Sequence, residues 1–143
     1  MCSLIEGFEF LFSNKDVKRF KGKWLMTINK AIIRAELYSV AFVRDYVQFG
    51  FHCETNDAGL TAYSKPLVTL NGIQYSQEDT GYRDALCGLI DQVVEDVQTE
   101  NDDSIKIMFI GNDELFIRPN DIEREILVEY AVFKCGNTFQ VWN

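Results

Sequence analysis

The sequence predicts an α+β domain of mainly antiparallel strands, with about seven or eight strands in two pseudo-repeated halves and one or two helices packed on the sheet. Residues 103–119 have the pattern of a β-hairpin, because alternating apolar residues flank turn-forming residues at 111–113. The same pattern occurs 58 positions earlier, where residues 47–51 match residues 105–109. The 143 residues are 47% hydrophobic, which excludes a disordered chain and supplies one shared core.

The amino-terminal segment has two features. Residues 4–12 are rich in Phe and Leu, which favours a first strand, and residues 13–16 have the composition of a turn or a helix N-cap. Five of the basic residues lie within 15–23, close to Phe20 and Trp24. Such a run invites a nucleic-acid interpretation. The acidity of the rest of the chain favours a solvated turn, or an intramolecular counterpart to the acidic half.

The segments that precede the two hairpins have an ambiguous period. Residues 24–37 and 86–97 share their apolar spacing, which fits one face of a helix. Enrichment in Val and Ile after residue 90 instead favours a strand. We therefore expect a helix over 77–89 followed by a strand over 92–98, and one long helix through Val97 is the alternative.

Domain organisation follows from the repeat. The halves span about 24–70 and 84–142, and the best linker is Asn71-Gly72 together with residues 76–81. Because a three-stranded unit buries too little apolar surface to be stable alone, residues 1–143 are predicted to form a single domain.

The carboxy-terminal segment completes the predicted sheet. Residues 120–125 are expected to form a charged turn, and residues 126–134 and 138–142 two strands joined by a tight Gly-Asn turn. Removal of the last strand is expected to destabilise the protein.

Cysteine and histidine usage predicts no metal site and no cofactor. Cys2, Cys53, Cys87 and Cys135 are far apart without a CxxC pattern, so reduced and partly buried thiols are expected. His52 is the only histidine and lies in phase with the outward residues of a strand.

No apolar run reaches the ~20 residues of a membrane span, and the amino terminus lacks the basic residues of a secretory signal. A cytoplasmic protein is therefore expected.

The formal net charge of −8 is unevenly distributed. Residues 1–50 contain eight Lys or Arg and five Asp or Glu, whereas residues 51–143 contain six and seventeen. Such a surface repels nucleic acid and anionic membranes and attracts a basic protein. A solubility role is the alternative interpretation, since acidic surfaces are ordinary in cytosolic proteins.

The carboxy-terminal half resembles a known family pattern, carried by residues 86–97, 104–109, 115–117, 129–133 and Val141-Trp142. These residues look like those of small bacterial β-rich immunity proteins, which protect cells from polymorphic or contact-dependent-inhibition toxins. The matching positions are core and turn residues, so no functional residue transfers. The resemblance implies non-catalytic binding and neutralisation of a cognate toxin domain, often a basic nuclease.

Acidic residues that bracket the predicted hairpins are the candidate partner-binding residues: Asp91, Glu95, Asp96, Glu100, Asp102, Asp103, Asp113 and Glu114. A solvated acidic edge that prevents sheet aggregation is the alternative role for each of them. The sequence contains no GxGxxG, P-loop or HExxH pattern, and His52 and Cys53 lack the setting of a nucleophile and its base. No catalytic residue is predicted.

Two other functions stay open. The first is a homodimer or other homo-oligomeric structural or adaptor domain that pairs exposed β-edges. The second is a small-molecule-binding β domain in which Trp24, Tyr38, Tyr46 and Tyr63 line a pocket.

Overall fold

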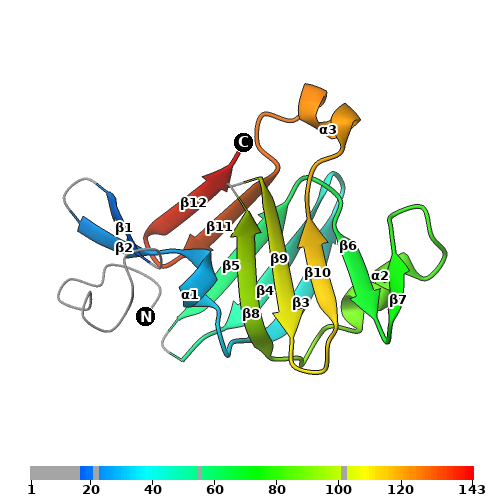
Figure 1. The fold of residues 1–143 in the computed structure, drawn as a ribbon, viewed down its shortest axis with the longest axis horizontal. Helices are drawn as coiled ribbons and strands as arrows, with labels where there is room; N and C mark the ends of the chain where they lie inside the picture. Colours follow the sequence, from blue (N-terminus) through cyan, green and yellow to red (C-terminus); the bar gives the residue numbers. More distant parts are fainter. Residues whose placement is uncertain (1–16, 21–22, 55, 101–102) are drawn as a thin grey trace.

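The computed structural model of the chain describes residues 17–20, 23–54, 56–100 and 103–143. Two five-stranded antiparallel sheets lie one in front of the other (Figure 1). Inward-facing side chains of both sheets belong to one buried hydrophobic cluster. The predicted strand at 4–12 and turn at 13–16 lie outside the described residues. Among the described helices none is long and apolar enough to cross a membrane.

The first sheet has the strand order β12-β11-β5-β4-β3. Its strands, in chain order, are β3 (Glu36–Val43), β4 (Tyr46–His52), β5 (Asp57–Ala62), β11 (Ala131–Cys135) and β12 (Thr138–Trp142). The second sheet has the order β7-β6-β10-β9-β8. Its strands are β6 (Leu67–Leu70), β7 (Ile73–Tyr75), β8 (Val94–Glu100), β9 (Ser104–Phe109) and β10 (Glu114–Ile117).

Short elements complete the fold. A two-stranded sheet consists of β1 (Val17–Phe20) and β2 (Lys23–Met26). The helices are α1 (Ile28–Ala31), α2 (Tyr82–Cys87) and α3 (Asp121–Ile126). The described part of the chain is thus α+β and mainly antiparallel, as predicted, but its two main sheets hold ten strands and it has three helices. The predicted seven or eight strands and one or two helices were too few.

The two halves of the chain exchange hairpins between the sheets. The hairpin β6–β7 follows β5 in sequence, yet β6 pairs with β10 of the second sheet. The hairpin β11–β12 follows β10, yet β11 pairs with β5 of the first sheet. Each sheet therefore combines three consecutive strands from one half with a hairpin from the other. The predicted halves at 24–70 and 84–142 do not correspond to separate sheets.

Equivalent β-bulges interrupt β3 and β8. Val94 pairs with Phe109 but Asp96 with Met108, so the strand contains one extra residue. The bulge lets Val94 and Val97, three positions apart, both face the core. That spacing is also typical of a helix, which accounts for the ambiguous period in the sequence. The corresponding irregularity in β3 lies between Leu37 and Ser39.

Several predicted boundaries were wrong. The helix expected over 77–89 spans only α2, and the long helix through Val97 is excluded because β8 begins at Val94. The Asn71-Gly72 pair is the turn between β6 and β7, where φ is 53° and 81°, rather than part of a linker. Positive φ at both positions is what a two-residue hairpin turn requires.

The predicted turn at 120–125 is helix α3. Asn120 accepts a hydrogen bond from the Glu123 N–H at 2.8 Å, and the Glu123 carboxylate accepts from the Asn120 N–H at 3.0 Å. This reciprocal pair is a capping box, which satisfies two backbone donors at the start of the helix. The Glu123 carboxylate also accepts from the Ser64 hydroxyl and the Lys65 N–H, at 3.1 and 3.0 Å. These bonds hold α3 against the segment between β5 and β6.

The described cysteines differ from one another. The Cys53 thiol is half-buried and lies 3.6 Å from the Ala31 carbonyl oxygen, and burial raises its pKa. Cys87 is exposed and free. Cys135 is buried and disulfide-bonded, so the expectation of reduced cysteines is wrong for this residue.

Candidate partner-binding surface

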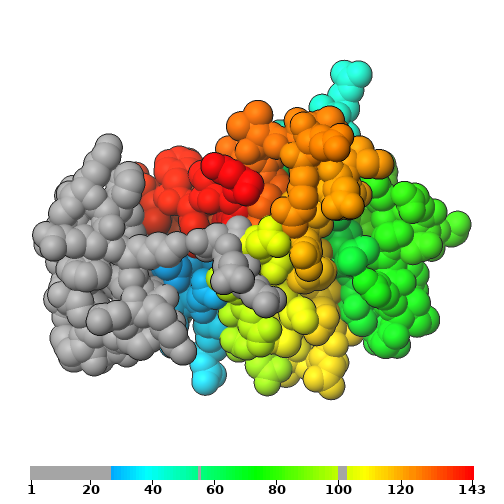
Figure 2. Space-filling view, turned by 45° about the horizontal axis from the view of Figure 1, so that its top comes forward, coloured from blue at the N-terminus to red at the C-terminus, as the bar shows by residue number. Residues whose placement is uncertain are grey.

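The predicted acidic residues are divided between the two ends of the second sheet. Glu100 ends β8 and Asp103 directly precedes β9, so both lie beside the β8–β9 turn. Asp102 lies outside the described residues. The other five lie at the opposite end, where β8 begins and β9 turns into β10: Asp91, Glu95, Asp96, Asp113 and Glu114. Figure 2 shows this end in yellow-green and yellow along the lower edge of the molecule.

The bulge in β8 places two consecutive carboxylates on the surface. In a regular strand neighbouring side chains point to opposite faces, so one of Glu95 and Asp96 would face the core. Because the bulge adds a residue between Val94 and Asp96, both acidic side chains are exposed.

Met108 lies between two acidic residues on the outer face of the sheet. It is paired with Asp96 on one side and with Glu114 on the other. Neighbouring strands are about 4.8 Å apart, so the two acidic positions are about 10 Å apart across Met108. Ile110 directly follows the last residue of β9 and is 61% exposed, and its N–H donates to the Val93 carbonyl at 2.9 Å. We call the surface formed by these six residues the acidic end: Asp91, Glu95, Asp96, Met108, Ile110 and Glu114.

Asp91 is held by its backbone. Its φ of 76° is in the left-handed region, which Asp tolerates better than most residues. Its N–H donates to the Leu37 carbonyl at 2.8 Å, while its side chain is exposed. The carboxylate of Asp91 is therefore presented from a turn fixed to the first sheet.

Asp113 has a structural role. It is only 8% exposed, and its Oδ1 accepts a hydrogen bond from the Asn71 N–H at 3.0 Å. Its Oδ2 accepts from Gln92 Nε2 at 2.8 Å. A buried carboxylate must be hydrogen-bonded, and here the bonds connect the β9–β10 turn to the β6–β7 turn and to the start of β8. Both carboxylate oxygens of Asp113 thus accept hydrogen bonds from within the chain, and Asp113 is not part of the acidic end.

Asp103 is paired with two arginines. Its carboxylate lies 2.9 Å from Arg124 Nη1 and 3.5 Å from Arg118 Nη2. The hydrogen bond from Arg124 is the main reason that the pKa of Asp103 lies below its ordinary value. The two arginines balance the negative charge of Asp103, so this residue does not make a partner surface more acidic.

His52 is an exposed strand residue, as predicted, with 69% of its side chain accessible. Its Nδ1 lies 2.8 Å from Asp57 Oδ1, and its ring makes an edge contact with Tyr38 at 5.9 Å between centroids. Within the described residues no group of three or more His, Cys, Asp or Glu side chains is arranged to hold a metal ion.

The interpretation of the sequence missed Met108 and Ile110. The signal was present, because both have the outward phase of β9 and adjoin the turn at 111–113. A half-buried Met108 between two acidic residues, with the exposed Ile110 two positions further on, resembles the centre and rim of a protein interface.

Comparisons with protein-family models, with curated proteins and with solved structures found no match for this chain.

Proposed function

We propose that this protein is a non-catalytic immunity-type protein that binds and neutralises a cognate basic toxin domain, for example a nuclease, in the bacterial cytoplasm. The observation that supports the proposal is the acidic end, where Asp96 and Glu114 flank Met108 on one face. Asp91 and Glu95 add two exposed carboxylates at the same end.

Charge complementarity explains why such a surface suits a basic partner. Exposed carboxylates attract basic groups over distances comparable to the Debye length of about 8 Å at physiological salt. The attraction mainly raises the association rate. Rapid capture is the useful property when the free partner is lethal. The net charge of −8 acts in the same direction.

Apolar contact would supply the slow dissociation. Ile110 is exposed at the end of β9 and Met108 is half-buried beside it. Met and large aliphatic side chains at the centre of a contact bury apolar area, at roughly 25 cal/mol per Å². The surrounding carboxylates then contribute orientation and specificity.

The test starts by capturing partners from lysate of cells that express the toxin, at low and then high salt. The rate at which the captured partner associates is then measured with the wild-type protein and with an acidic-end variant. This variant carries Asp91→Asn, Glu95→Gln, Asp96→Asn and Glu114→Gln. A matched control neutralises four exposed carboxylates elsewhere: Asp45, Glu54, Glu78 and Glu125. The acidic-end variant should associate at least about tenfold more slowly at low salt and show less salt dependence than the control.

Two results would contradict this proposal. Equal association rates for the acidic-end variant and the control would remove the acidic end from the interface. Failure of the wild-type protein to protect cells that co-express the captured partner would remove the neutralising role.

A homo-oligomeric structural or adaptor domain is the second candidate. Strand β12 is the last in the order of the first sheet, and its Phe139 and Val141 side chains are 60% and 47% exposed. An apolar edge strand is a template for pairing with another chain. Sedimentation equilibrium over a range of concentrations, with Phe139→Ser as the comparison, distinguishes this candidate from a monomeric binder.

A further inference from the structure

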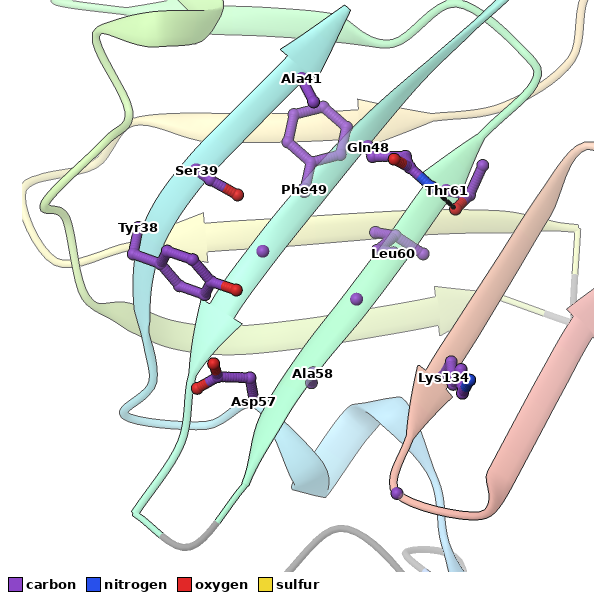
Figure 3. Close-up of a pocket in the computed structure, with 13 residues that line it drawn as sticks. Tyr38, Ser39, Ala41, Gln48, Phe49, Asp57, Ala58, Leu60, Thr61 and Lys134 are labelled. Atoms are coloured by element: carbon purple, nitrogen blue, oxygen red, sulfur yellow. Dashed lines mark hydrogen bonds between the residues drawn. The ribbon is translucent and has the colours of Figure 1, made fainter. Parts of the chain in front are cut away.

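The outer face of the first sheet contains a hollow of about 340 Å³ (Figure 3). Its lining comes from β3, β4, β5, β11 and the turn after β11. It includes the exposed side chains of Tyr38, Gln48 and Lys134, so the hollow lies on the opposite side of the sheet from the buried core. It is independent of the acidic end, which is on the second sheet.

Two paired glycines form the floor of the hollow. Gly50 on β4 and Gly59 on β5 are register partners, and both line the hollow. A Cβ added to Gly59 would meet nothing within 4 Å, so the space above this residue is open. The equivalent pair in the second sheet is Met108 and Glu114, whose side chains occupy the corresponding positions. The hollow therefore lies where the first sheet has two glycines and the second sheet has two larger side chains.

Tyr38 forms one wall above Gly50. A Cβ added at Gly50 would lie 2.9 Å from Tyr38 Cζ and 2.5 Å from Ser39 Oγ. The ring is thus packed against the glycine, and its edge contact with His52 fixes it further. The bulge in β3 is the reason that Tyr38 and Ser39 both line this face.

Polar side chains form the remaining walls. Asp57 and Thr61 lie two residues before and after Gly59 on the same strand, about 7 Å away in each direction. Lys134 is the register partner of Gly59 on the other side. Gln48 Nε2 donates to the Thr61 hydroxyl at 3.4 Å, and His52 lies 2.8 Å from Asp57, so both walls are held by neighbours.

The combination of groups indicates the class of ligand. Hydroxyl, amide, carboxylate and ammonium groups surround a flat floor of suitable size for one or two rings. Asp57 and Lys134 carry opposite charges, so no net charge is required of the ligand. A sugar ring has hydroxyls that both donate and accept, and C–H groups that pack against an aromatic ring such as Tyr38. We propose that the hollow binds a neutral sugar ring, with one ring placed over Gly59.

Other small ligands fit these groups less well. A phosphate or nucleotide would be repelled by the carboxylate of Asp57, which lines the hollow. A lipid chain needs an enclosed apolar cavity, whereas this hollow lies on an outer face and is lined by Gln48, Asp57 and Lys134.

The test is an NMR titration of the full chain, labelled with ¹⁵N, against neutral hexoses, N-acetylhexosamines and disaccharides made from them. At least one sugar should produce saturable shifts at the amides of Gly59, Thr61 and Lys134. Gly59→Val places a side chain in the open space and should weaken that affinity by about tenfold or more. Its melting temperature should stay close to that of the wild type, because the added Cβ meets nothing within 4 Å and Val is a favourable residue in a β-strand.

Thr69→Val, on the outer face of the second sheet, is the matched control and should leave the titration unchanged. Inorganic phosphate and a neutral peptide are tested at the same concentrations as the sugars. The proposal is overturned if no sugar shifts these amides, if phosphate or the peptide shifts them instead, or if Gly59→Val binds the sugar as the wild type does.

Discussion

Asp113 and Gln92 form a hydrogen bond of 2.8 Å between the turn before β10 and the turn before β8. The same carboxylate accepts from the Asn71 N–H at 3.0 Å. Its neighbour in sequence, Glu114, lies on the outer face of the second sheet and contributes to the acidic end. Two adjacent acidic residues thus have different roles.

Substitution of these two residues should separate stability from binding. Asp113→Ala should lower the free energy of unfolding by about 1–3 kcal/mol, because it leaves the Asn71 N–H and one of the two N–H groups of Gln92 Nε2 without an acceptor. Glu114→Ala should change stability by no more than about 0.5 kcal/mol. Urea denaturation of both variants measures the difference. An Asp113→Ala protein as stable as the wild type would show that these bonds are replaceable by water.

Gly50 and Gly59 should respond in opposite ways to Ala. Gly50→Ala should be destabilising by about 0.5–1.5 kcal/mol, because the new methyl group would lie 2.5 Å from Ser39 Oγ and 2.9 Å from Tyr38 Cζ and force both side chains to turn away. Gly59→Ala should be neutral or stabilising by about 0.4–1 kcal/mol, because the methyl group enters open space and the unfolded chain loses freedom. Thermal unfolding of both variants tests this, and equal losses would contradict the geometry of the hollow.

We expect the ion pairs of Asp103 to stabilise the protein less in acid. Its folded pKa is lowered, chiefly by the hydrogen bond from Arg124, so its contribution is present above the unfolded value of about 3.9. The contribution is lost as pH falls through the folded value. Asp103→Asn should therefore be less stable than the wild type at pH 7, and the gap should close below about pH 4. Arg124→Gln is the matched variant, and a gap that does not vary with pH in either variant would contradict the ion pair.

We expect the buried hydroxyl of Tyr82 to stabilise the protein less in alkali. Its hydroxyl donates to the Pro66 carbonyl at 2.6 Å, and burial, with a smaller effect of Glu123, raises the pKa of the phenol. The contribution is complete below the unfolded pKa of about 10 and is lost as pH rises above it. Tyr82→Phe should cost about 1–3 kcal/mol at pH 7, and the difference from the wild type should shrink above about pH 10. Denaturant unfolding at both pH values measures this, and an unchanged difference would be contrary to expectation.

Local patterns predicted part of this structure well. The strand pairs β9–β10 and β4–β5 follow from alternation of apolar and polar residues around turns, which involves only neighbouring positions. Two local signals were misinterpreted. Asn71-Gly72 has the typical residues of a hairpin turn, and Asn120 followed by Glu123 has the spacing of a capping box.

The sequence by itself determined the α+β class, the alternating strands and the excess of carboxylates. Only the tertiary structure decided which hairpin joins which sheet, because strand pairing across many residues leaves no local trace. It also decided the roles of the acidic residues. Asp113 became a buried acceptor, Asp103 an arginine partner and Asp96 a surface carboxylate, since burial and hydrogen-bond partners come from distant parts of the chain.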